Sequence, residues 1–223
     1  MEMGMGIELR NRIARRAAEE IHNGMVVNLG IGIPSLVPDF LPSDMRVMFH
    51  AENGILGMGP SPAVGEEDEN LCNAGGFPVT LIPGGAYFDS SLAFGMIRCG
   101  KVDLTILGSL QVSEKGDLAN WIVPGKKVPG MGGAMELAQK AKKVIVVMNH
   151  CDKAGNPKVV SSCTLPLTSA ECVDLIITEL AVLEIKNGKL WLKELFAPYD
   201  IQTVIERTGC GINLPEKIRK IAY

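Results

Sequence analysis

Short continuous apolar runs, separated by segments with helical spacing, set the pattern of this chain. Apolar residues recur every fourth position from Leu9 to Ile21, which predicts an N-terminal helix that Gly24 ends. Residues 86–98 and 132–142 are also predicted to be helical. The apolar runs lack strict alternation, as is typical of strands covered on both faces, and they span residues 25–34, 45–49, 79–82, 102–107, 144–148 and 174–180. This order predicts an α/β fold with an open, largely parallel sheet flanked by helices.

Turn and capping residues predict where some of these segments begin and end. We expect Pro83-Gly84-Gly85 to close the strand at 79–82, because proline and glycine are strong turn signals. Ser35 follows a glycine-rich turn and is a candidate cap for a short helix.

The last third of the chain changes character. Two apolar strands flank Asn187-Gly188, and this dipeptide is a strong signal for a tight β-hairpin. Asp200 is placed to cap a final helix over residues 201–208. Since the chain has no internal repeat or evident linker, we interpret residues 1–223 as a single domain with a C-terminal hairpin and helix.

Composition narrows the class of protein. With 47% hydrophobic and 21% charged residues, the chain is globular rather than disordered. No apolar run reaches the ~20 residues needed to span a bilayer, and no apolar segment follows the N-terminal arginines, so neither a membrane protein nor a signal peptide is expected. A net charge of −3 without a basic block gives no indication of nucleic-acid binding.

Cysteine and histidine spacing argues against a metal site. Six cysteines lie far apart and form no CxxC pair, which indicates reduced, mostly buried thiols in a cytoplasmic protein. His22, His50 and His150 are scattered, and we interpret each as a core or helix-end histidine. No bound metal is expected.

Glu52 is the most informative single residue. It follows the apolar run at 45–49 and lies on a tight turn with Asn53 and Gly54. Desolvating an unpaired carboxylate is costly, so a glutamate at the tip of a buried strand suggests chemistry, either as general base or as covalent nucleophile. The alternative is that Glu52 only closes the turn.

Glycine-rich or polar turns follow several of the predicted strands. In open α/β sheets, ligands bind beyond the carboxyl ends of the strands, where glycine backbone N–H groups can form an oxyanion hole or cradle a phosphate. The third glycine of the dinucleotide fingerprint is missing, and there is no P-loop sequence. The candidate ligand-binding positions are Asn28, Gly30, Gly32, Asn53, Gly54, Gly130, Met131, Gly132 and Gly133. For the last turn, a crowded helix start is the alternative.

Four segments occur in order over essentially the whole chain: 28–34 (NLGIGIP), 52–57 (ENGILG), 73–76 (NAGG) and 121–135. Together they resemble the β subunit of the 3-oxoacid CoA-transferases of family I, such as acetoacetate or butyrate–acetoacetate CoA-transferase. In that family the glutamate of a Ser-Glu-Asn-Gly turn is the covalent nucleophile. Here Ala51 replaces the serine, which removes a hydroxyl beside the carboxylate.

The resemblance implies transfer of coenzyme A (CoA) by ping-pong chemistry on Glu52. It also implies that the Asn28 side chain and the Gly133 N–H stabilise oxyanions, with Gly132 giving room, and that CoA is a substrate rather than a resident cofactor. The site of such enzymes lies between an α and a β subunit. We therefore expect an α-subunit partner in an αβ or α₂β₂ complex, acting on short-chain acids such as acetoacetate, acetate, butyrate or succinate.

Some assignments stay open at this point. Gln111 either lines the pocket or caps the turn after Gly108-Ser109, and capping is favoured. Lys126 either meets CoA phosphates or belongs to a solvated loop. Two rival functions use the same glycine turns: a sugar-phosphate isomerase with Glu52 as general base, and a non-catalytic CoA-binding regulatory module.

Overall fold

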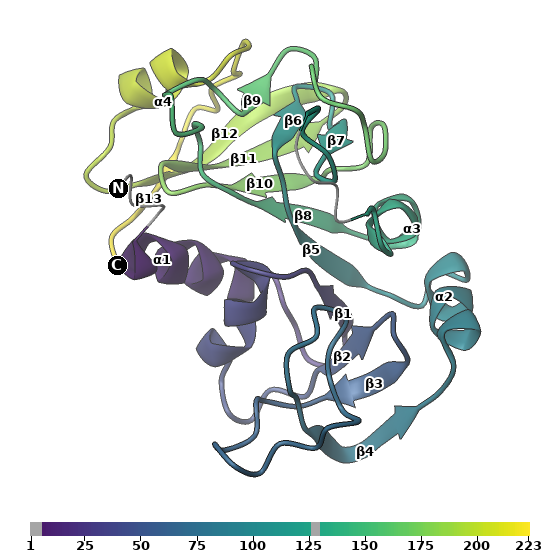
Figure 1. Cartoon of the computed structure of the whole chain (residues 1–223). Helices are drawn as coiled ribbons and strands as arrows, with labels where there is room; N and C mark the ends of the chain where they lie inside the picture. The colour runs from purple at the N-terminus through teal and green to yellow at the C-terminus, as the bar shows by residue number, and fades with distance from the viewer. Residues whose placement is uncertain (1–5, 126–129) are drawn as a thin grey trace.

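The largest sheet has a parallel centre. A computed structural model describes residues 6–125 and 130–223, and within these ranges ten strands join in the order β13-β12-β11-β10-β8-β5-β1-β2-β3-β4 (Figure 1). The strands of this parallel centre are β1 (Val26–Leu29), β2 (Met48–Ala51), β5 (Leu104–Gly108), β8 (Val144–Val147) and β10 (Leu175–Ile177). The predicted α/β fold with a largely parallel sheet is confirmed.

Strands added at both ends complete this sheet. At one end β2 continues antiparallel into β3 (Ile55–Met58) and β4 (Leu81–Tyr87). At the other end lie β11 (Ala181–Lys186), β12 (Lys189–Phe196) and β13 (Arg219–Ile221). A smaller sheet contains β6 (Gln111–Ser113), β7 (Leu118–Ala119) and β9 (Val159–Val160).

Helices cover the two faces of the parallel centre (Figure 1). On one face, α1 (Ile7–Ala18) and the 3₁₀-helix η1 (Pro34–Phe40) pack on alternate strand residues such as Val27 and Ile106. On the other face, α2 (Ser90–Arg98) packs against α3 (Ala134–Lys140) through Ile97 and Leu137, and Arg98 pairs with Glu136 over 2.6 Å. Because side chains alternate along a strand, residues next to Val27, including Asn28, face α2 and α3.

The C-terminal hairpin and helix are confirmed. Asn187 and Gly188 have positive φ angles of 54° and 65°, as the tight hairpin turn between β11 and β12 requires. The Asp200 side chain accepts a hydrogen bond from the Thr203 N–H over 2.8 Å and caps α4 (Ile201–Arg207). None of the helices in the described residues is both long and apolar enough to cross a membrane.

Several predicted boundaries are wrong at the β4 end of the sheet. Pro83-Gly84-Gly85 does not close a strand but lies within β4, which is tolerable because β4 is an edge strand and needs fewer backbone donors. The next helix begins at Ser90 rather than residue 86, since Asp89 caps it by accepting from the Leu92 N–H. Ser35 is not a helix cap, because its hydroxyl donates to the Gly32 carbonyl instead.

Candidate active site

Glu52 lies on the turn that joins β2 to β3, at the carboxyl end of a parallel strand. Ala51 pairs with Ile55 across the turn, and the Gly54 N–H closes it by donating to the Ala51 carbonyl over 3.0 Å. The Glu52 side chain is half-buried on the α2–α3 side of the sheet, where it contacts the beginning of α3. The structure therefore holds a carboxylate at the sheet edge where ligands bind in this type of fold.

Gly54 is required by the packing of this turn. Its φ angle is 117°, and a Cβ at this position would lie 2.0 Å from the Phe88 carbonyl oxygen. The Phe88 N–H in turn donates to the Gly54 carbonyl over 3.0 Å, so the turn is joined to the segment that leads into α2. Asn53 points outwards and its Nδ2 donates to the Cys72 carbonyl over 2.7 Å.

Asn28 holds the Glu52 carboxylate from the neighbouring strand. Its side-chain Nδ2 donates to Glu52 Oε2 and to the His50 carbonyl, both over 3.1 Å. Only 1% of Asn28 is exposed, so this donor is fixed in a position shielded from water. Such a donor can stabilise negative charge that develops on a carboxyl oxygen of Glu52.

Gly133 completes the trio that the sequence predicted to lie together. It precedes α3, and a Cβ at this position would lie 3.0 Å from Glu52 Cγ and 3.2 Å from Glu52 Oε1. The backbone therefore runs directly against the carboxylate. Gly130 and Gly132, with φ angles of 101° and 55°, form the bend that brings the chain to this point.

The other predicted site residues do not contact Glu52 in the interactions described below. Gly30 follows β1 and its N–H donates to the Ile106 carbonyl over 2.9 Å, while Gly32 has a φ angle of 89° in the next turn. The Gln111 carboxamide is engaged elsewhere, because Oε1 accepts from the backbone N–H groups of residues 164 and 165 and Nε2 donates to Thr164 Oγ1. This geometry supports a structural role for Gln111, close to the favoured capping interpretation. Lys126 lies outside the described residues.

His50, which the sequence indicated to be a core or helix-end histidine, is buried next to this site. It pairs with Asn28 in the β1–β2 register, and its Nδ1 lies 3.5 Å from Asn28 Nδ2. Burial lowers the pKa of His50, while the nearby Glu52 carboxylate opposes that shift. The signal that could have found it is its spacing of two residues from Glu52, since alternate residues of a strand share a face.

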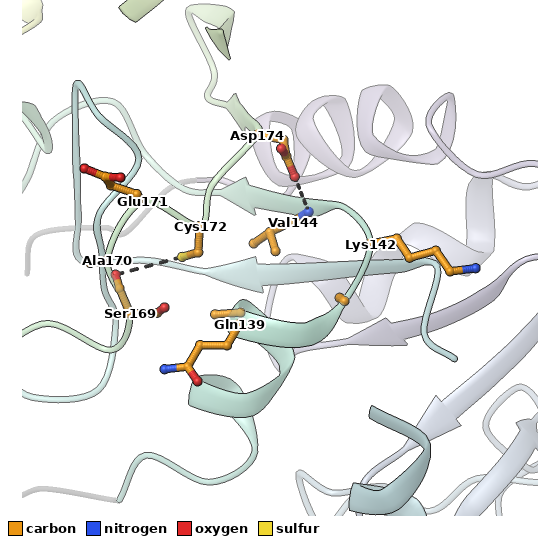
Figure 2. A pocket seen from close by; sticks show the side chains of 10 residues that line it. Gln139, Lys142, Val144, Ser169, Ala170, Glu171, Cys172 and Asp174 are labelled. Carbon is orange, nitrogen blue, oxygen red and sulfur yellow. Dashed lines mark hydrogen bonds between the residues drawn. The ribbon is translucent and has the colours of Figure 1, made fainter. Parts of the chain in front are cut away.

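A cavity of about 300 Å³ lies elsewhere on the molecule (Figure 2). It is lined by the C-terminal half of α3, by Val144 at the amino end of β8, and by residues 169–172 and Asp174. Glu52 lies at the opposite, carboxyl edge of the parallel strands, so this cavity is separate from the carboxylate site. Within the part of the chain that the structure describes, no group of three or more His, Cys, Asp or Glu side chains could hold a metal ion.

Comparison with known proteins identifies the family. The coenzyme A transferase family model matches residues 10–206 of this chain. The chain belongs to the coenzyme A transferase family. It is a CoA-transferase, and this membership favours CoA transfer over the isomerase and regulatory-module alternatives.

Some relatives of this CoA-transferase match it over nearly their whole chain, whereas others are more than twice as long. It is 63% identical over 212 residues to a probable coenzyme A transferase subunit beta of Bacillus subtilis, covering 95% of this chain and 98% of that one. It is 49% identical over 220 residues to the human mitochondrial succinyl-CoA:3-ketoacid coenzyme A transferase 2, covering 98% of this chain but 43% of that one. An acyl-CoA transferase of Escherichia coli O157:H7 shares the fold, with a TM-score of 0.75 at 20% identity over 99% of this chain and 44% of that one.

Proposed function

We propose that this CoA-transferase moves CoA between an acyl-CoA and a short-chain carboxylic or 3-oxo acid through a covalent intermediate on Glu52. The observation that carries the proposal is a half-buried carboxylate that accepts from the Asn28 amide over 3.1 Å and packs closely against Gly133. A carboxylate is a poor nucleophile towards a thioester in water, so it needs fixed donors and a site that excludes water.

The chemistry proceeds in two half-reactions. Glu52 attacks the thioester carbonyl of the acyl-CoA, which gives a mixed acyl-glutamyl anhydride and expels CoA thiolate. The thiolate then attacks the glutamyl carbonyl, so that a glutamyl-CoA thioester forms and the first acid leaves as its carboxylate. An incoming carboxylate attacks the glutamyl thioester and the steps run in reverse, which regenerates free Glu52 and releases the new acyl-CoA.

Asn28 and Gly133 supply the groups that these steps need from the chain. Each attack on a carbonyl passes through a tetrahedral oxyanion, and we assign its stabilisation to Asn28 Nδ2 and the Gly133 N–H. The glycine-lined positions around them contact CoA in this proposal, so that binding energy from the remote parts of CoA is realised at the reacting carbonyl. These positions are Gly30, Gly32, Asn53, Gly54, Gly130, Met131 and Gly132.

The functional unit in this proposal contains an α subunit, as αβ or α₂β₂. Known relatives and features of the surface both support a partner. The Bacillus subtilis relative is named as a beta subunit, and the human relative is a chain of which this one covers only 43%. Near the site, Ile31, Phe77 and Tyr87 are 60% or more exposed, and β4 is a free sheet edge within the described structure. Exposed apolar groups and an open edge strand are typical of a surface that another chain covers.

The acids exchanged are proposed to be small carboxylates or 3-oxo acids. The human relative is named for succinyl-CoA and a 3-ketoacid, and this chain is 49% identical to it. Succinate, the acid part of succinyl-CoA, and a 3-ketoacid both carry a carboxylate that can attack a glutamyl thioester, so the proposed chemistry accommodates either acid without any further group. A panel of acetoacetate, acetate, butyrate and succinate, each tested with the complete enzyme, will identify the preferred pair.

Trapping the intermediate tests the mechanism directly. The chain and its partner are incubated with acyl-CoA without an acceptor acid, digested, and analysed by peptide mass spectrometry. We expect a CoA-sized addition on Glu52, which borohydride converts to the corresponding alcohol. If the peptide that contains Glu52 stays unmodified while CoA transfer proceeds, the covalent mechanism is wrong.

A methyl group at position 133 tests the contact between Gly133 and Glu52. Because the φ and ψ angles of Gly133 are −77° and −4°, alanine fits the backbone, but its Cβ would lie within 3.0–3.3 Å of the Glu52 side chain. We expect Gly133→Ala to lower kcat by about 10- to 100-fold through displacement of the nucleophile, with an unchanged melting temperature.

The matched control for that variant is Gly95→Ala in α2. A Cβ at position 95 meets no atom within 4 Å, so this variant adds a methyl group in a helix without touching the site. We expect wild-type turnover and equal or higher stability, since alanine favours helix. Equal turnover for both alanine variants would contradict close packing of Gly133 on Glu52.

A further inference from the structure

Three buried polar side chains form a row across the centre of the sheet, on the face that carries α2 and α3. His50 in β2, Asn28 in β1 and Thr105 in β5 are directly paired in the strand register, and their exposures are 1%, 1% and 0%. Most of the neighbouring residues on these strands are apolar. Burying polar groups in such strands is costly unless they satisfy one another, so this row needs an explanation beyond packing.

The contacts of the row converge on the Asn28 carboxamide. The Thr105 hydroxyl faces Asn28 Oδ1 as its donor at 3.5 Å, a separation longer than that of an ordinary O–H···O hydrogen bond. On the other side, Asn28 Nδ2 faces three acceptors: the His50 carbonyl, Glu52 Oε2 and, at 3.5 Å, His50 Nδ1. Thr105 thus meets the oxygen of the amide, while His50 and Glu52 meet its nitrogen.

We propose that Thr105 and His50 are positioning residues that hold the Asn28 carboxamide with its N–H₂ group directed at Glu52. This inference rests on the proposed role of Asn28 as an oxyanion donor. An asparagine amide is nearly symmetric in shape, and rotation by half a turn would place Oδ1 against the carboxylate and remove the donor. In this proposal, the row determines whether Asn28 Nδ2 or Asn28 Oδ1 faces the Glu52 carboxylate.

Thr105 acts on the oxygen end of the amide. Among the described residues its hydroxyl is the side-chain donor to Asn28 Oδ1. Without that hydroxyl, the amide oxygen would be buried and unpaired in its working orientation, and an unsatisfied buried acceptor is unfavourable. The Asn28 carboxamide would then spend less time with Nδ2 directed at Glu52, and kcat would fall in proportion to that population.

His50 acts on the nitrogen end, and only in its neutral form. Its Nδ1 can accept from Asn28 Nδ2 when the proton is on Nε2, whereas an Nδ1–H would face the amide N–H₂ as donor against donor. Around the ring lie the Phe88 side chain, the Ala93 carbonyl of α2 and the charge of Glu52. Burial lowers the pKa of His50, and once Glu52 is a neutral thioester its opposing charge is gone, so His50 stays neutral in that state.

The test for Thr105 compares two substitutions in the complete enzyme with its partner. Thr105→Val keeps the shape of the side chain but removes the hydroxyl, and Thr105→Ser keeps the hydroxyl. We expect Thr105→Val to lower kcat by about 10- to 100-fold with KM for acyl-CoA within about threefold, and Thr105→Ser to recover most of kcat. Wild-type kcat in Thr105→Val, or equal loss in both variants, would overturn the role of the hydroxyl.

The test for His50 uses a pH profile. His50→Asn places an oxygen acceptor where Nδ1 lies and does not titrate, whereas His50→Leu removes the acceptor. We expect His50→Leu to lose about 10-fold or more in kcat, and His50→Asn to retain most of kcat and to decline less steeply than wild type on the acid side below pH 6.5.

Failure of this inference and failure of the proposed function give different experimental results. If the wild-type complex transfers CoA through a Glu52 adduct but His50→Leu matches it in kcat and pH profile, the role of His50 in positioning Asn28 is wrong. If the wild-type complex forms no Glu52 adduct, the mechanism itself fails and the row has no oxyanion donor to position.

Discussion

Replacing Glu52 with glutamine is expected to abolish CoA transfer while the fold stays intact. The carboxamide has nearly the same shape and its oxygen can still accept from Asn28 Nδ2, but it cannot attack a thioester. Loss of a covalent nucleophile removes the whole covalent route, so we expect kcat to fall by at least about 10⁴-fold. Steady-state turnover of the complete enzyme, together with thermal unfolding of the variant, measures both parts of the prediction.

Two further variants sharpen this result. Glu52→Asp keeps the charge but withdraws it by one methylene, and a displacement of about 1 Å costs about 10²-fold in rate. Glu66→Gln makes the same chemical change in an exposed loop and is expected to leave turnover unchanged. Substantial transferase activity in Glu52→Gln would rule out Glu52 as the acyl carrier.

The purified chain alone is expected to be almost inactive, and co-purification with its α subunit is expected to restore full turnover. The reaction needs a site that excludes water. Glu52 is held on one side by Asn28 and Gly133, and the wall opposite these residues is proposed to come from the partner. We expect turnover of the chain alone to be lower by at least about 10³-fold, because oxyanion stabilisation depends on an enclosed site.

Sedimentation velocity run beside the activity assay links this loss to assembly. The expected result is that activity appears only in fractions that contain both chains. The Glu52→Gln variant of this chain, mixed with the unmodified α subunit, should assemble normally but stay inactive. This control separates loss of assembly from loss of chemistry. Full turnover from this chain alone would contradict a shared site.

The sequence was most informative where each strand has neighbours on both sides. In β8, four consecutive buried apolar residues match the predicted apolar run, because both faces of the strand are covered. The hairpin at Asn187-Gly188 was equally clear, since its turn needs two positive φ angles. At the free edge the same reasoning failed. Pro83-Gly84-Gly85 was interpreted as a turn, but an edge strand tolerates proline because one side of its backbone has no strand partner, and β4 continues through these residues.

Motifs placed Asn28, Glu52 and Gly133 together, whereas the pairing of strands was needed to see their support. His50 and Thr105 lie 22 and 77 residues from Asn28 along the chain, yet the register sets both beside it. Register depends on long-range pairing that a single sequence does not display. Sequence motifs and the family resemblance therefore pointed to Glu52, but not to the side chains that are proposed to orient its neighbour Asn28.

The turn that carries Glu52 is joined to its surroundings as one stiff unit. Gly54 is wedged against the Phe88 carbonyl just before α2, α2 packs on α3 through Ile97 and Leu137, and α3 begins beside Glu52. In the proposed mechanism, Glu52 and the Gly133 N–H would thus move together, so we expect this half of the enzyme to keep its shape around a bulkier acyl group. Selectivity among acids, and any engineering of it, should depend mainly on residues contributed from across the interface.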